Sequence, residues 1–339
     1  MGGGVGHFLL RSAVYAGALL VVLAATYYGI DPLRTARSYP RYYDDDFYPN
    51  TAVVGINNFN ARTDRRKYDS FILGNSLSKA VRVDDWKRYL PEEALAYHLS
   101  SDCQHLPLSL KMLEYAADNV DSLRHVLLYM SVWSLQDSID FRPAALPHPD
   151  VFDGLQRWKY RAWHFAQAIN RPAIIMGISL RMAGRLLYTP RMSEPLRTGI
   201  SYNSQTNELL FVDEINHADT VSQADDAFVR KWQFYNKVPL RVNSDRVTPR
   251  VASLLMNLKA VADGRGATLD VIIVPDEDRT VLSAHDVEIM TSIFGSHFHD
   301  LTWERVMERD NIRNFYDPSH FDPDMTGRFL DDALGDKEE

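Results

Sequence analysis

Two short segments at opposite ends of the chain carry residue types that are suited to acyl transfer. Ser76 closes an apolar run that begins at Phe71, and Gly74 between them lets the backbone turn tightly after a strand. Near the other end, Asp317 lies three residues before His320. A serine, a histidine and an acid supply a nucleophile, a base and a group that orients the base. The sequence therefore predicts a Ser76–His320–Asp317 triad.

Each segment also has a plainer interpretation. A glycine two residues before a serine, at the end of a strand, is often only a turn. Asp317 or Ser319 would also serve as the N-cap of a final helix, which would leave His320 as an ordinary surface residue. The two segments occur in this order at opposite ends of one α/β pattern, and that combination favours the catalytic interpretation.

Composition limits the kinds of protein that this chain can be. It has 339 residues, of which 45% are hydrophobic and 24% charged, so a large packed core is expected. The net charge of −8 argues against nucleic acid as the main partner, because phosphate binding needs a basic face. Cys103 is the only cysteine, which excludes an intrachain disulfide and a cysteine-rich zinc site. Cys103 is disfavoured as a nucleophile because Ser76 has the better context.

The N-terminal region is predicted to be a membrane anchor over residues 1–36. Residues 12–30 carry no charge, and Tyr27 and Tyr28 lie near their far end, where aromatic rings favour the membrane interface. At about 1.5 Å per residue this segment just spans the hydrocarbon core of a bilayer. A cleaved signal peptide is the alternative, with a small-residue site ending at Ala24. The uncharged tract continues to Ile30, which favours the uncleaved anchor.

The rest of the chain predicts an α/β fold with a mid-chain insertion. Residues 37–66 are rich in Tyr, Asp and Asn without a clear period and are expected to be a linker. Alternating strands and helices over 67–339 predict a parallel sheet that is covered on both faces. An insertion over about 143–246 interrupts this alternation of strands and helices, and within it we expect an aromatic helix around Trp158 and a hairpin over 201–213. Strands are predicted at 68–73, 93–99, 124–133 and 268–274, and helices at 106–120, 251–262 and 329–334.

A family resemblance adds to these residue patterns. Gly74, Asn75 and Ser76, together with Asp317 and His320, resemble the first and last sequence blocks of the SGNH/GDSL hydrolase superfamily. The wider pattern is similar to the membrane-anchored, cell-envelope branch, which includes proteins of teichoic-acid D-alanylation and alginate O-acetylation. The likeness covers roughly 68–135 and 268–334. It implies a three-layer sandwich around a central parallel sheet, with Gly74 and Asn75 lining the pocket.

The sequence departs from this family at the oxyanion hole. The second family block usually holds a glycine whose N–H helps to bind the oxyanion, and the nearest position here is Asp102 or Cys103. The third block usually holds an asparagine, but this chain has Ser131 and Ser134 and no asparagine there. The resemblance implies that the Cys103 N–H and one of these serines act as donors. Because losing one donor costs about 100- to 1000-fold in turnover, a slow or catalytically silent protein is the alternative.

The expected function follows from the triad, the anchor and the resemblance together. We expect a membrane-anchored serine acyltransferase or esterase that moves or removes an acyl group, most simply acetyl, on an envelope polysaccharide. The resemblance implies a multi-spanning O-acyltransferase as partner and a soluble domain on the extracytoplasmic, periplasmic side of the inner membrane. The charges that flank the membrane segment favour the opposite orientation. Arg34, Arg37 and Arg41 on its C-terminal side outnumber Arg11 and would place the bulk of the chain in the cytoplasm. The alternative is a silent polysaccharide-binding or scaffold component.

Neither a metal nor a cofactor is expected. His297 and His299 alternate ahead of Asp300, but the sequence shows no third ligand nearby, and such a pattern is more typical of an exposed edge strand. His98 and His105 flank the second family block and are expected to be ordinary polar residues at a strand end, with pocket lining as the alternative.

Overall fold

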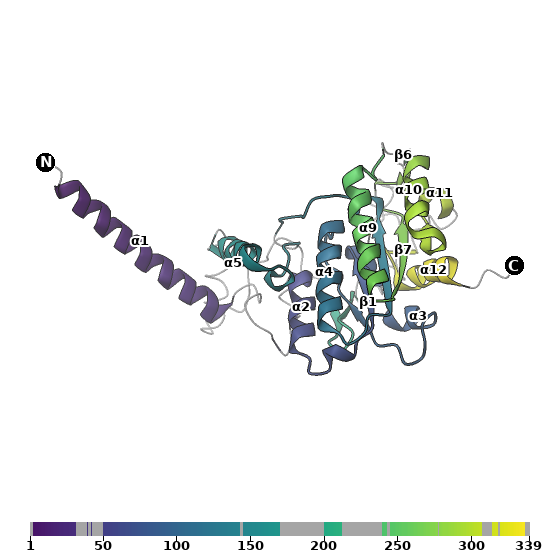
Figure 1. The fold of residues 1–339 in the computed structure, drawn as a ribbon, viewed down its shortest axis with the longest axis horizontal. Helices are drawn as coiled ribbons and strands as arrows, with labels where there is room; N and C mark the ends of the chain where they lie inside the picture. The colour runs from purple at the N-terminus through teal and green to yellow at the C-terminus, as the bar shows by residue number, and fades with distance from the viewer. Residues whose placement is uncertain are drawn as a thin grey trace, which may run out of the picture.

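A parallel β-sheet with five strands organises the chain beyond the N-terminal helix in the computed structural model (Figure 1). Its strand order is β2-β1-β3-β7-β9, and every neighbouring pair is parallel. The carboxyl ends of all five strands therefore lie at one edge. The strands are β1 Ser70–Gly74, β2 Ala96–His98, β3 His125–Ser131, β7 Thr268–Val274 and β9 Phe298–Asp300.

The structure describes most of the chain with several gaps. The described residues are 3–31, 39, 42, 50–142, 145–169, 200–211, 239–242, 245–276, 278–306, 314–317 and 319–335. Most of residues 37–49 in the predicted 37–66 linker, much of the predicted insertion over about 143–246 and Pro318 lie outside these ranges.

Two apolar clusters, one on each face of the sheet, hold the helices in place. Side chains alternate between faces along a strand, so Phe71 and Leu73 enter one cluster while Ile72 enters the other. The first cluster packs against α2 Thr51–Ala61, α4 Leu106–Asn119, α9 Pro249–Gly264 and α10 Ala284–Phe294. The second packs against α3 Val83–Lys87, α11 Trp303–Val306 and α12 Pro323–Leu334.

Local sequence signals explain where the late helices α9 and α12 begin. Thr248 caps α9 by accepting a hydrogen bond from Val251 N, and Pro249 occupies the first turn. Asp322 caps α12 in the same way by accepting from Met325 N at 2.6 Å. The interpretation of Asp317 or Ser319 as the cap of the final helix is therefore wrong, because α12 begins later in the sequence than these residues.

The N-terminal helix α1, Gly3–Ile30, extends away from the sheet (Figure 1). Its segment Gly4–Gly29 has a mean hydropathy of 2.0 and is long and apolar enough to cross a membrane. Helix α5, Gly154–Ile169, lies beside the carboxyl end of α1. There the ring of Tyr27 packs edge-on against Phe165, with the ring centroids 5.5 Å apart.

Short elements complete the described chain. The expected hairpin is present as β4 Ile200–Asn203 and β5 Glu208–Phe211. A second antiparallel hairpin consists of β10 Phe315–Asp317 and β11 His320–Phe321, and β6 Arg241–Val242 pairs in parallel with β8 Thr280–Val281. The 3-10 helices are η1 Arg65–Lys67, η2 Ser76–Ala80, η3 Val132–Ser134, η4 Pro149–Val151 and η5 Gly295–His297.

One segment differs from the sequence-based expectation. Residues 37–66 were expected to be a linker, but they contain α2, whose Ile56 and Phe59 are fully buried in the first core cluster. The helical period is hard to see because Gly55 and several asparagines interrupt it. The packed part of the chain therefore begins before the first core strand. The edge strand expected around His299 is present as β9.

Candidate functional site

Ser76 stands where the chain leaves β1 and enters η2, at the carboxyl edge of the sheet. From β1 the chain adds β2 on one side and then β3 on the other, so the strand order reverses between β1 and β3. Ligands bind outside the carboxyl ends of the strands at such a switch point. Ser76 is half-buried at this edge, so its hydroxyl is within reach of a ligand.

Gly74 is required here by close packing of the backbone. A Cβ atom at this position would lie 1.9 Å from the carbonyl oxygen of Tyr129 and 2.9 Å from the Cβ of Ser78. No side chain fits without moving β3, because the first contact is with backbone. The absence of a side chain thus lets the end of β1 lie against β3 just before the serine.

Asn75 ties the serine turn to the end of β3. Its side-chain amide donates to Ser134 Oγ at 2.8 Å and to Ser131 Oγ at 3.3 Å. Its side-chain oxygen accepts from Leu77 N at 3.1 Å, which caps η2 directly after Ser76. All three polar side chains are buried. Ser131 and Ser134 thus accept from Asn75, and Asn75 positions the turn that presents Ser76.

His320 reaches Ser76 from the other end of the chain. Its Nε2 lies 2.8 Å from Ser76 Oγ, although the two residues are 244 positions apart in sequence. The imidazole ring stacks on the ring of Tyr316, with centroids 5.5 Å apart and planes 12° apart. Tyr316 is itself buried against Phe211 of β5. The mid-chain hairpin therefore holds in place the tyrosine on which the imidazole ring stacks.

Asp317 is placed only through its backbone. It ends β10, and its Cα pairs with that of His320 across the β10–β11 hairpin. Its side chain lies outside the described part of the chain, as does Pro318. The pairing places acid and base on adjacent strands of one hairpin, and the role of Asp317 as orienter stays a prediction.

The loop that follows β2 lies against the serine turn. Ser101 N donates to Gly74 O at 3.1 Å, and the Lys79 ammonium forms an ion pair with Asp102. Asp102 N donates to Thr51 Oγ1 at 3.0 Å, so this N–H is occupied and is not an oxyanion donor. The backbone of Cys103 has φ +54°, in the left-handed region that favours glycine.

The backbone N–H groups of Ser76 and Cys103 are the candidate oxyanion donors. Within the described ranges, no residue accepts a hydrogen bond from the N–H of Ser76 or from that of Cys103. Burial raises the pKa of the Cys103 thiol to about 11, which keeps it protonated at neutral pH and removes it as a nucleophile. Cys103 therefore offers its backbone and not its sulfur.

Lys79 and Tyr316 were not singled out by the sequence. Lys79 lies three residues after Ser76 and is 5% exposed, whereas a lysine there would ordinarily be expected in solvent. Its partner Asp102 is 18% exposed. Tyr316 is adjacent to Asp317, and a pattern of aromatic, acid and histidine in one short hairpin is the only signal that would have found it.

His98 and His105 each form a hydrogen bond to a backbone carbonyl. His98 Nε2 donates to Val81 O at 2.8 Å, and His105 Nδ1 donates to Ser138 O at 3.0 Å. Burial lowers the pKa of both imidazoles, so both are neutral near pH 7. Their hydrogen bonds explain why each is held at a strand or helix end.

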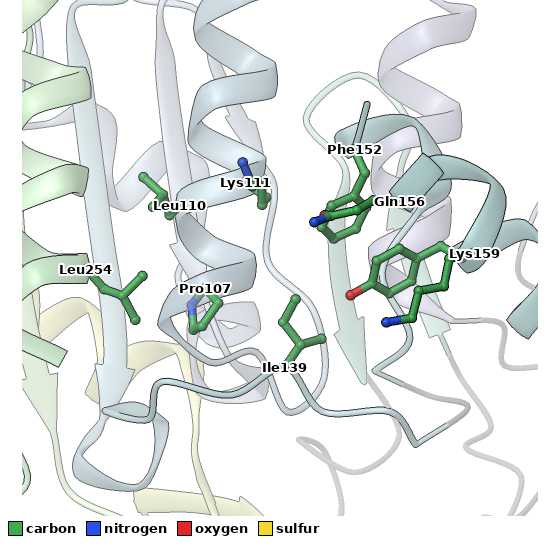
Figure 2. A pocket seen from close by; sticks show the side chains of 9 residues that line it. Pro107, Leu110, Lys111, Ile139, Phe152, Gln156, Lys159 and Leu254 are labelled. Carbon is green, nitrogen blue, oxygen red and sulfur yellow. The ribbon is translucent and has the colours of Figure 1, made fainter. Parts of the chain in front are cut away.

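A cavity of about 270 Å³ lies elsewhere, between α4, α5 and α9. Pro107, Leu110 and Lys111 from α4 face Phe152, Gln156 and Lys159 across it (Figure 2). None of the residues that line it belongs to the Ser76–His320 pair. Across the described part of the chain, no group of three or more histidine, cysteine or acidic side chains is placed to hold a metal ion.

No protein-family model matches the chain, and no curated protein matches it.

Proposed function

We propose that the chain is a serine acyltransferase or esterase in which Ser76 is the nucleophile and His320 the general base. The observation that carries this proposal is the 2.8 Å contact between His320 Nε2 and Ser76 Oγ at the carboxyl edge of the sheet. Within hydrogen-bond reach, an imidazole activates a hydroxyl by taking its proton. The half-buried serine also lies at a switch point of the sheet, where open α/β sheets bind their ligands.

The reaction proceeds in two half-reactions. Ser76 Oγ attacks the carbonyl carbon of an acyl ester while its proton passes to His320 Nε2. The tetrahedral oxyanion is bound by the N–H groups of Ser76 and Cys103. His320 then gives the proton to the departing alcohol oxygen, and the acyl group stays on Ser76. In the second half-reaction His320 takes a proton from a water or a sugar hydroxyl, whose oxygen attacks the acyl carbon. As the bond from the acyl carbon to Ser76 Oγ breaks, His320 Nε2 returns the proton to Ser76 Oγ. Asp317 holds the imidazole in the correct tautomer.

The setting of this chemistry is part of the proposal. Helix α1 keeps the domain at a membrane, beside lipid-linked or membrane-delivered acyl donors, so transfer onto an envelope polysaccharide is the reaction we favour. The proposal extends to an SGNH-like three-layer sandwich, an extracytoplasmic domain at the inner membrane and a multi-spanning O-acyltransferase as partner. The parallel sheet, helices packed on both faces and the serine after β1 support it.

A second candidate function has its own observation. Ser131 and Ser134 lie where the family usually holds an asparagine, so no asparagine amide from this position points at a substrate. Their hydroxyls instead accept from the Asn75 amide. This arrangement favours a catalytically silent polysaccharide-binding protein that retains the fold. The two functions differ in whether Ser76 becomes acylated.

An activated-serine probe decides between them. The full chain is treated with a fluorophosphonate and its intact mass is measured, with Ser76→Ala and Ser292→Ala in parallel. Ser292 is a solvent-exposed hydroxyl on α10 and serves as the matched control. We expect one adduct on wild type and on Ser292→Ala and none on Ser76→Ala. No adduct on wild type, or one that survives Ser76→Ala, would contradict the enzymatic proposal.

Two further measurements refine it. If an acyl-enzyme forms from an aryl acetate, transfer to an added oligosaccharide in preference to water identifies a transferase. A topology reporter fused after Glu339 tests the side of the membrane. The same intact mass shows whether residues 1–24 are retained, as an uncleaved anchor requires.

A further inference from the structure

Helix α5 has an apolar face that is turned away from the rest of the domain. Tyr160 and His164 on its inner face are 5% and 4% exposed. On the opposite face Leu155 and Trp158 are 85% and 64% exposed, and Ala162 continues this stripe at helical spacing. A helix that packs on one side ordinarily shows polar residues on the other. Large apolar side chains on the outer face therefore indicate a second, apolar environment.

Cations flank this stripe. Lys159 lies over the ring of Trp163 at 4.5 Å, and Arg161 lies over the ring of Trp158 at 5.2 Å. Residues 154–169 contain no acid, although Arg161 also pairs with Asp150 at 3.3 Å, just before the helix. Lys159, at the other border of the stripe, lines the cavity that faces α4 (Figure 2). An apolar stripe with tryptophan and bordering cations is typical of a helix that lies in a membrane interface.

The stripe is continuous with the candidate membrane helix. Phe165 lies on the same side of α5 as Trp158, and it is covered by Tyr27 from the last turns of α1. Figure 1 shows α5 beside the carboxyl end of α1, between α1 and the sheet. Tyr27 and Tyr28 mark the level at which aromatic rings of a spanning helix favour the headgroup region. The exposed face of α5 is therefore at the depth where the bilayer surface would lie.

We propose that α5 lies in the plane of the membrane interface beside α1 and binds anionic phospholipid. Leu155, Trp158 and Ala162 face the acyl boundary, and Arg161 at the border of this stripe reaches the phosphate groups. This inference rests on α1 spanning the bilayer and is independent of the chemistry at Ser76. With one spanning helix alone, the domain would be free to tilt. Two contacts fix the orientation of the sheet relative to the bilayer.

The experiment places an environment-sensitive label at position 155. Full-length Leu155→Cys is reconstituted in nanodiscs of phosphatidylcholine and phosphatidylglycerol and labelled with a nitrobenzoxadiazole maleimide. Met256→Cys, an exposed apolar residue on α9, is the matched control, since α9 is remote from α1 in Figure 1. Labelling of the wild-type chain gives the background from Cys103, whose raised pKa slows the reaction of its thiol with maleimide.

We expect blue-shifted emission from the label at position 155. We also expect doxyl-labelled lipid to quench it about twofold more strongly than the label at position 256, because the apolar face of an interfacial helix is buried about 5–10 Å into the boundary between headgroups and acyl chains. Replacing phosphatidylglycerol with phosphatidylcholine, or introducing Arg161→Glu, is expected to weaken the quenching. Equal spectra at 155 and 256 would overturn the proposal. So would a blue shift at 155 that lipid quenchers do not affect and that dilution in detergent removes, which would indicate a second copy of the chain.

Discussion

Asn75 and Ser134 are joined by a buried hydrogen bond of 2.8 Å that ties the serine turn after β1 to η3 after β3. The bond lies at the point where the strand order reverses, so it fixes two neighbouring strand ends relative to each other. Ser131, the second acceptor, is farther away at 3.3 Å. The unequal distances make the two serines a matched pair for testing how Ser76 is held in place.

Ser134→Ala is expected to cost more stability than Ser131→Ala. Removing Ser134 leaves a buried amide N–H without its closer acceptor, a cost of about 1–3 kcal/mol in the free energy of unfolding. It also loosens the turn, so we expect acylation of Ser76 to slow about 10- to 100-fold. Denaturant unfolding and stopped-flow acylation measure both effects. Equal losses in the two variants would contradict the predicted difference between the serines, and wild-type behaviour in Ser134→Ala would contradict the role assigned to Asn75.

Gly74→Ala is expected to disrupt the junction of β1 with β3. The added Cβ would lie 1.9 Å from Tyr129 O, and backbone cannot move aside as a side chain would. We expect a loss of about 3 kcal/mol or more, at the upper end of overpacking effects. Gly264→Ala at the end of α9 is the control, because its Cβ meets nothing within 4 Å. Thermal unfolding of the control should match wild type or exceed it.

Lys79→Met tests the ion pair with Asp102, which lies next to the candidate oxyanion donor Cys103 in the loop after β2. Breaking a buried pair leaves the Asp102 carboxylate without its main cation, and the cost is about 3 kcal/mol or somewhat less, since Asp102 is 18% exposed. The double variant Lys79→Met with Asp102→Asn should recover part of this loss. Lys111→Met is the control, because its pair with Glu114 is solvent-exposed and worth about 0.5 kcal/mol. Additive losses at Lys79 and Asp102 would argue against the pair.

Cys103→Gly tests whether the left-handed backbone matters more than the thiol. A non-glycine residue at φ +54° carries a strain of about 1–2 kcal/mol that glycine relieves. We expect Cys103→Gly to stay within about 1 kcal/mol of wild type and to retain acylation, because the N–H is unchanged. Cys103→Val, whose branched Cβ opposes this conformation, should lose both stability and rate. Loss of acylation in the glycine variant alone would show that the sulfur contributes.

The sheet could be predicted because its signals are local. The apolar run at Val126 to Met130 and the run ending at Val274 each form buried strands, and the pattern is visible in a few consecutive residues. Helix α2 was missed because Gly55 and its neighbouring asparagines weaken the helical period. Its burial comes from long-range packing, for example of Phe59 on Phe71 with ring centroids 6.0 Å apart.

The same distinction between local and long-range features applies to the residues of the candidate site. Ser76 and His320 could be identified because residue type and local spacing suffice, and the structure brings them together. The burial of Lys79, the φ of Cys103 and the stacking of Tyr316 on His320 depend on where distant segments meet. Ser131 and Ser134 were placed in the right region, but their hydrogen bonds to Asn75 follow from the register of β1 with β3, which residue type does not reveal.

Stability is expected to fall as pH drops below neutral, because two buried histidines are neutral in the folded chain. Burial lowers the pKa of His148 to about 3 and that of His164 to about 4. His148 Nε2 donates to Asn57 Oδ1 at 3.0 Å, and His164 Nε2 donates to Pro147 O at 2.9 Å. In the unfolded chain a histidine binds a proton near pH 6.5. The unfolded state therefore holds more protons between pH 6.5 and 4, and stability decreases through that window.

His164→Gln separates this effect from general acid sensitivity. Between pH 7 and pH 5, His164 alone should account for a loss of about 2 kcal/mol in the free energy of unfolding. The glutamine variant cannot titrate, so its unfolding free energy should fall less steeply over that range, whatever its stability at pH 7. Chemical denaturation at closely spaced pH values measures the slope directly. If wild type and variant have parallel slopes, His164 is not neutral and buried in the folded chain as its contacts indicate.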